Sequence, residues 1–326
     1  MNQLFPPKPT FTEQNLSNQA GRVFIITGGA SGIGLELCKI LYAANATIYI
    51  ATRSSEKIAT ATKTIKTIYP SSNGRLEPLI LDLADLKTIK PAVETFLAKE
   101  TRLDVLVHNA GVMMPPQGSK TAQGHELQIG TNALGPFLLT QCLEERLQAT
   151  ARLEGMPRGR VRVIWVASMI SLGAPKGGVI WDDAKGAPKL SGDSMSDYMQ
   201  GKVGCVFLAD EFARRVKKDG IISASVNPGI VKTELQRHAP AAMSVVMGVV
   251  FKGPKYGAVA GAYSELFAAC SPDVSVEKSG SYIIPWGRFG CILEDIAERM
   301  KPGSSGKKFL GKKFWNWCER ETLSYQ

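Results

Sequence analysis

Short apolar, β-branched runs alternate with longer amphipathic stretches along most of this sequence. An apolar, β-branched run bounded by turn residues indicates a buried strand, whereas apolar residues three or four positions apart indicate a helix. Strands that alternate with helices usually pair in parallel, with helices on both faces of the sheet. No internal repeat or interdomain linker interrupts the alternation. The chain of 326 residues is therefore expected to be an α/β protein with a doubly wound parallel sheet.

The alternation also predicts an order of elements. Predicted strands lie within residues 23–27, 47–51, 76–83, 103–108, 161–167, 221–226 and 281–284. Predicted helices span residues 32–44, 55–69, 86–99, 125–149 and 196–216. We expect one domain over residues 1–326, with extensions at 1–20 and 286–326. Residues 170–197, 233–259 and the tail after Pro285 are expected to be irregular. Insertions beyond the carboxyl ends of the strands can form a substrate pocket.

Composition argues against several classes of function. The net charge is +10, but the basic residues are spread along the chain, so no nucleic-acid partner is expected. The six cysteines include no Cys-x-x-Cys pair and there are three histidines, so no metal site is expected. The N-terminus lacks the apolar segment of a signal peptide, and no run of 18 apolar residues occurs. Together with the cysteine usage, these features predict a cytoplasmic protein.

A glycine-rich turn joins the first predicted strand to the first predicted helix. Residues 27–34 read Thr-Gly-Gly-Ala-Ser-Gly-Ile-Gly, which spaces Gly28, Gly32 and Gly34 as Gly-x-x-x-Gly-x-Gly. Glycines in this context permit a tight turn and let the backbone approach a pyrophosphate at the helix N-terminus. The turn, which includes Ser31 and Ile33, is therefore predicted to bind a dinucleotide.

The residue after the second predicted strand bears on the choice of dinucleotide. NAD sites usually have an acidic residue there, which binds the ribose hydroxyls. This chain has Ala51-Thr52-Arg53 instead. The Arg53 guanidinium can pair with a 2′-phosphate through charge-assisted hydrogen bonds. The cofactor is therefore predicted to be NADP(H).

Tyr198 and Lys202 are four residues apart on a predicted helix, so their side chains share one face. A phenol has an ordinary pKa of roughly 10, and a neighbouring ammonium group favours the phenolate. Such a pair suits proton transfer to or from a carbonyl oxygen. The spacing alone is common, and its significance depends on the dinucleotide site predicted beside it.

Taken together, these motifs make the chain resemble the short-chain dehydrogenase/reductase family over residues 20–235. The resemblance implies a Rossmann-type fold and a nicotinamide dinucleotide bound by the glycine turn, Tyr198, Lys202 and several further residues. Those further matches are Asp82, Leu83, Asn109, Ala110, Gly111, Pro228, Gly229, Val231 and Thr233. Two other residues, Asn132 and Ser168, match the polar residues that complete the family's catalytic set.

The resemblance also implies a role for each catalytic residue. Tyr198 would protonate the carbonyl oxygen during reduction or deprotonate the alcohol during oxidation. Ser168 would hydrogen-bond the same oxygen, and Lys202 would hold the nicotinamide ribose and lower the tyrosine pKa. Asn132 would position a water molecule that links Lys202 to solvent. Hydride transfer belongs to the cofactor.

The gap between Ser168 and Tyr198 is long for the family. It is similar to that of the retinol-dehydrogenase-like, NADP-preferring branch, to which the Ala-Thr-Arg sequence also points, and many fungal tailoring reductases share these features. Apolar residues near the motifs predict a hydrophobic ketone, aldehyde or alcohol as substrate. They are Met113, Met114, Leu172, Val179, Ile180, Trp181 and the segment 235–251.

Alternatives remain open on the sequence alone. The same Tyr–Lys pair could serve reduction of an activated C=C bond, or the chain could be a noncatalytic NADP-binding scaffold, although its Ser-Tyr-Lys set is intact. The segment 243–251 and the basic aromatic tail 307–317 could touch a membrane surface. The tail could equally pack on its own domain or contribute to a homo-oligomer.

Overall fold

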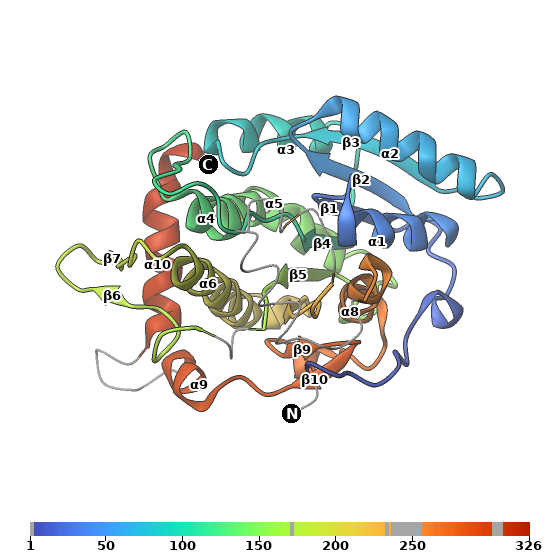
Figure 1. Ribbon diagram of the computed structural model, residues 1–326. Coiled ribbons are helices and arrows are strands. Elements are labelled where there is room, and N and C mark those ends of the chain that lie inside the picture. The colour runs from blue at the N-terminus through green and yellow to red at the C-terminus, as the bar shows by residue number, and fades with distance from the viewer. Residues whose placement is uncertain (1–2, 170–172, 232–234, 236–255, 302–308) are drawn as a thin grey trace.

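The computed structural model describes residues 3–169, 173–231, 235, 256–301 and 309–326. Eight strands form one sheet in the order β10-β9-β8-β5-β4-β1-β2-β3 (Figure 1). Their bounds are β1 (Val23–Thr27), β2 (Thr47–Thr52), β3 (Arg75–Ile80), β4 (Val105–His108), β5 (Arg162–Val166), β8 (Ile222–Val226), β9 (Tyr282–Ile284) and β10 (Arg288–Gly290). All neighbours pair in parallel except β9 and β10. The predicted doubly wound sheet is thus confirmed, with one antiparallel edge strand added.

Helices cover both faces of the sheet (Figure 1). One face carries α1 (Gly32–Ala43), α2 (Ser55–Ile68) and α8 (Ala258–Cys270), and the other carries α3 (Ile89–Leu97), α5 (Gly135–Ala151) and α6 (Ser194–Arg215). Side chains of β1 alternate between the two cores: Phe24 and Ile26 face the first, Val23 and Ile25 the second. Short turns of 3-10 helix lie at Glu13–Asn15, Leu86–Thr88, Lys217–Asp219, Val276–Lys278 and Leu323–Tyr325.

The long helix predicted at residues 125–149 is interrupted in the structure. It consists of a single turn, α4 (Leu127–Ile129), a π-helical turn over Gly130–Leu134, and then α5. A side chain at Gly135 would place its Cβ 2.5 Å from the Leu83 carbonyl oxygen, so a residue without a side chain is needed there. Such π-turns occur frequently at functional sites, and this one contains Asn132.

The prediction of an irregular tail after Pro285 is wrong. The tail contains β10, α9 (Glu294–Met300) and α10 (Leu310–Thr322), and α10 packs across α6 and α5. The Phe314 ring lies where any side chain on Gly204 would be, so the two helices approach closely. Trp315 packs edge-on against Phe137, with ring centres 4.8 Å apart. The α10 aromatics Phe314, Trp315 and Trp317 are therefore core residues of this chain.

The insertion before α6 forms a small hairpin of β6 (Trp181–Asp182) and β7 (Ala187–Pro188). Val179 is buried in the core, whereas Ile180 is 40% exposed. Leu172 and the segment 243–251 lie outside the described residues. Across the described part of the chain, no helix combines the length and apolar character that crossing a membrane requires.

Candidate active site

The glycine turn between β1 and α1 has the backbone geometry that a close phosphate approach needs. Gly28 and Gly32 have φ values of 67° and 55°, which residues with side chains rarely adopt. A Cβ at Gly34 would lie 2.5 Å from the Asn109 amide nitrogen. The Ser31 side chain makes no capping hydrogen bond to the first turn of α1. The positive end of the α1 dipole therefore lies at a turn whose backbone an anion can approach.

The motif after β4 is fastened to the glycine turn. The Asn109 amide donates to the Thr27 carbonyl oxygen at 2.8 Å, and the Ala110 backbone N–H donates to the Thr27 hydroxyl at 3.0 Å. A Cβ at Gly111 would lie 3.1 Å from Asn132 Oδ1 and 3.5 Å from Lys202 Nζ. Residues 109–111 thus connect the predicted phosphate turn to the predicted catalytic lysine.

Asn132 holds the backbone that follows this motif. Its Oδ1 accepts from the Val112 N–H at 2.8 Å, and its Nδ2 donates to the Val112 carbonyl at 2.9 Å. Its own carbonyl oxygen accepts from the Cys205 thiol at 3.2 Å. Both ends of the Asn132 amide are therefore engaged with protein backbone, which gives this residue a positioning role.

Tyr198 and Lys202 lie on α6 and face the carboxyl end of β5. Lys202 Nζ donates to the Val166 carbonyl oxygen at 2.8 Å and lies 5.8 Å from the centre of the Tyr198 ring. Each residue is only 4% exposed. Ser168 follows β5, and its carbonyl oxygen accepts from the Tyr282 hydroxyl at 2.7 Å. Tyr282, which sequence reasoning missed, anchors Ser168 from β9, which is separated from β5 in the sheet by β8.

The remaining predicted cofactor residues lie around the same edge of the sheet. Arg53 Nη1 is 3.6 Å from Asp82 Oδ2, and the Arg53 side chain is 69% exposed. Gly229, with φ 79°, donates its N–H to the Asn227 side chain at 2.9 Å. Val231 pairs through a β-bridge with Tyr256. Thr233 lies outside the described residues.

Helix α8, which sequence reasoning also missed, packs beneath this edge. A Cβ at Gly261 would lie 3.0 Å from Ile33 and 3.3 Å from the Pro228 carbonyl oxygen. Glu265 on the same helix is fully buried, and neither of its carboxylate oxygens has a hydrogen-bond partner among the described residues. Burial raises the pKa of the Glu265 carboxyl to about 8, and the Lys202 ammonium partly opposes that rise.

Buried polar side chains hold the insertion that precedes Tyr198. Asp197 accepts from the backbone N–H groups of Ser191 and Gly192, at 2.7 and 3.0 Å. Gln200 accepts from the Ile180 N–H at 2.9 Å. A polar residue immediately before the Tyr–Lys pair, such as Asp197, is the sequence signal that could have indicated this anchoring.

The residues present fit a nicotinamide dinucleotide. The backbone of Gly28 and Gly32 turns tightly at the N-terminus of α1, where a pyrophosphate can approach, and Gly111 lies close to Lys202. Among the described residues, no three His, Cys, Asp or Glu side chains are grouped in a way that could hold a metal ion.

The sequence matches a known protein family and its members over most of its length. A family model described as short chain dehydrogenase matches residues 22–244. The short-chain dehydrogenase/reductase pkfC of Emericella nidulans is 41% identical over 320 residues, which cover 97% of each chain. The short-chain dehydrogenase/reductase iacJ of Pestalotiopsis fici is 43% identical over 324 residues, covering 98% of this chain and 95% of that one.

Solved structures share the fold at lower identity. The complex of Pseudomonas aeruginosa RhlG with NADP has a TM-score of 0.63 and 22% identity, covering 85% of this chain and 97% of that one. Levodione reductase has the same TM-score at 21% identity, covering 82% and 97%. The chain therefore belongs to the short-chain dehydrogenase/reductase family, whose members are oxidoreductases that act on alcohols and carbonyls with a nicotinamide cofactor.

Proposed function

We propose that this protein is an NADP(H)-dependent oxidoreductase that reduces a ketone or aldehyde of a hydrophobic small molecule, or oxidises the corresponding alcohol. The observation that carries the proposal is the position of Lys202, whose ammonium is fixed on the Val166 carbonyl beside the Tyr198 ring. Tyr198 acts as the general acid in reduction and as the general base in oxidation. The bound cofactor supplies or accepts the hydride.

The neighbouring residues prepare Tyr198 for this proton transfer. The Lys202 ammonium lies 5.8 Å from the centre of the Tyr198 ring, and both side chains are almost completely buried. Ser168, whose backbone Tyr282 holds, orients the substrate oxygen through its hydroxyl. Asn132 keeps residues 111 and 112 in place next to Lys202, and with a water molecule it provides the route by which a proton returns from solvent.

Arg53 supports NADP(H) over NAD(H). Among the described residues its exposed guanidinium forms an ion pair with Asp82 alone, at 3.6 Å, so it can turn towards a 2′-phosphate. The RhlG structure, which shares this fold, contains NADP. Met113 and Met114 are half-buried two and three residues after Gly111, and they support an apolar substrate. All six cysteines are free, which supports a reducing compartment such as the cytoplasm.

Substitution of the phenol tests the chemistry. Tyr198→Phe is expected to reduce turnover of carbonyl substrates by at least about a hundredfold, because general acid catalysis is lost. Binding of NADPH, measured by fluorescence titration, should change little. Tyr325→Phe removes a hydroxyl in the C-terminal turn and serves as the control. Near-wild-type turnover in Tyr198→Phe would overturn the assignment. Separately, analysis of the product would show whether the carbonyl or an activated C=C bond is reduced.

A further inference from the structure

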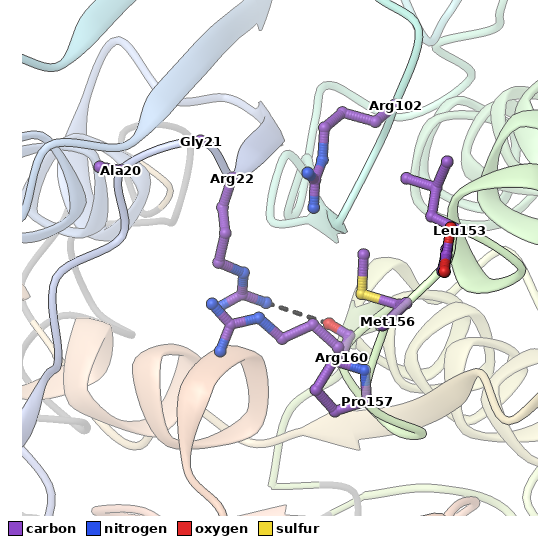
Figure 2. A pocket seen from close by; sticks show the side chains of 10 residues that line it. Ala20, Gly21, Arg22, Arg102, Leu153, Met156, Pro157 and Arg160 are labelled. Atoms are coloured by element: carbon purple, nitrogen blue, oxygen red, sulfur yellow. Dashed lines mark hydrogen bonds between the residues drawn. The ribbon is translucent and has the colours of Figure 1, made fainter.

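An open cleft lies at the amino ends of the strands, at the opposite edge of the sheet from the candidate active site. Its volume is about 730 Å³. Arg22 immediately precedes β1, Arg102 lies just before β4, and the loop 153–160 leads from α5 towards β5. Figure 2 shows these segments surrounding the cleft, with the side chains of Arg22, Arg102 and Arg160 directed towards it.

Positive charge in this cleft exceeds the negative charge available to balance it. Arg102 donates two hydrogen bonds to Asp104, at 2.9 and 2.6 Å, and so takes up most of that carboxylate. Arg22 is only 3% exposed, and its Nε has no hydrogen-bond partner in the described structure and lies 3.9 Å from Asp104. Its Nη1 donates to the Gln19 side-chain oxygen at 2.6 Å and to the Cys270 sulfur at 3.8 Å, and its Nη2 donates to the Arg160 carbonyl oxygen at 3.0 Å.

Arg160 is the arginine of this cleft whose positive charge is least balanced by neighbouring groups. Within the described ranges its guanidinium makes no hydrogen bond and no ion pair, although the side chain is partly buried. Burial lowers the pKa of Arg160, and the Arg22 cation lowers it further. Arg162, just behind the cleft, bonds only to the Gly159 and Ala268 carbonyls, and burial lowers its pKa to about 10. Several guanidinium groups therefore share one carboxylate.

Apolar and acidic groups complete the lining. Leu153 is 44% exposed, and Met156 and Pro157 lie beside it in the same loop. Glu154 is the exposed acidic residue of the lining, and it forms no ion pair in the part of the chain that the structure describes. An occupant with a compact double negative charge and an apolar group would match both kinds of surface, since paired guanidiniums recognise phosphate well.

We propose that this cleft is a binding site for an organic phosphomonoester, with the phosphate between Arg22 and Arg160 and the organic group against Leu153 and Met156. The site is distinct from the dinucleotide site, which lies at the carboxyl ends of the same strands. Its ligand is therefore neither the cofactor nor the substrate of the proposed reaction.

Phenyl phosphate is a suitable probe, and thermal unfolding of the full chain is a suitable measurement. A ligand that binds only the folded state raises the midpoint temperature in a saturable way. The titration is done at constant ionic strength, with sodium chloride, benzoate and inorganic phosphate as reference anions. We expect phenyl phosphate to give the largest rise, because it alone supplies both the dianion and the apolar ring.

Arg160→Gln is expected to weaken phenyl phosphate binding by at least about tenfold, which is typical when a charge-assisted hydrogen bond is lost. The matched control is Arg158→Gln, since Arg158 is exposed two positions earlier and its guanidinium contacts the carbonyls of Lys217 and Lys218 instead. Met156→Glu adds a negative charge to the lining and should also abolish binding. Equal affinity in the wild type and Arg160→Gln would overturn the proposal.

An equal rise with benzoate, chloride or inorganic phosphate would also overturn the proposal, because it would mean that the cleft does not select an organic dianion. The readout requires no turnover. The site can therefore fail this test while the oxidoreductase assignment stands, and the reverse is also possible.

Discussion

Arg53 is the exposed side chain to which we attribute the proposed preference for NADP(H). We expect Arg53→Asp to reduce the ratio of kcat/KM with NADPH to kcat/KM with NADH by about tenfold to a hundredfold, because a charge-assisted contact is replaced by repulsion. Steady-state kinetics with both cofactors measures the ratio. Lys63→Asp makes the same charge change on an exposed part of α2 and serves as the control. An unchanged ratio would remove Arg53 from the 2′-phosphate site.

Glu265 is a buried carboxyl whose effect on stability should depend on pH. Its pKa is raised to about 8 in the folded chain, against an ordinary value of 4.5. Below pH 4.5 both folded and unfolded states are protonated there. Above that pH the unfolded state loses its proton first, so ionisation favours unfolding until the folded carboxyl also titrates near pH 8.

We therefore expect Glu265→Gln to be more stable than the wild type at pH 8, by roughly a few kcal/mol, since each pKa unit corresponds to about 1.4 kcal/mol. The advantage should shrink as pH falls and vanish near pH 4. Urea unfolding at several pH values measures it. Glu298→Gln, at an exposed position on α9, should show no such trend. A pH-independent difference would mean that the Glu265 carboxyl has the same pKa in the folded and the unfolded state.

At the scale of elements, α10 stabilises the helix that carries the Tyr–Lys pair. Phe314 is fully buried over Gly204, which is two residues beyond Lys202 along α6. We expect Phe314→Ala to lower the free energy of unfolding by about 3–5 kcal/mol, the usual cost of deleting a buried aromatic ring. Lys312→Ala changes an exposed position on the same helix and should be nearly neutral. A loss below about 1 kcal/mol for Phe314→Ala would show that α10 docks weakly.

Sequence reasoning missed these elements for a common physical reason: they depend on contacts with residues distant in the sequence. Lysines alternate with aromatic residues over 307–317, and this pattern left open a membrane contact, packing on the chain's own domain or contact with a second subunit. In the structure, Phe314, Trp315 and Trp317 are instead all buried, because α10 lies in the angle between two helices and buries a wide face. The interruption of the helix at Gly130–Leu134 depends on its close approach to distant residues, which periodicity does not reveal.

At the scale of the whole molecule, local patterns predicted the parallel sheet because strands such as β1 and β4 are apolar runs followed by turn residues. The candidate active site followed from the same reasoning, since the carboxyl ends of parallel strands share one edge. The arginine cleft could not be predicted in this way. Arg22, Arg102 and Arg160 belong to three separate connections, and only the order of β1, β4 and β5 in the sheet brings them together.

The seating of Phe314 over Gly204 also bears on how the chain is made. During synthesis α6 leaves the ribosome long before α10 does, so until α10 docks the helix that carries Tyr198 and Lys202 has an uncovered apolar face. Contacts between segments far apart in sequence form late and leave such faces prone to aggregation in the meantime. A nascent chain that stalls before residue 310 would therefore have a nearly complete sheet but remain a candidate for chaperone binding.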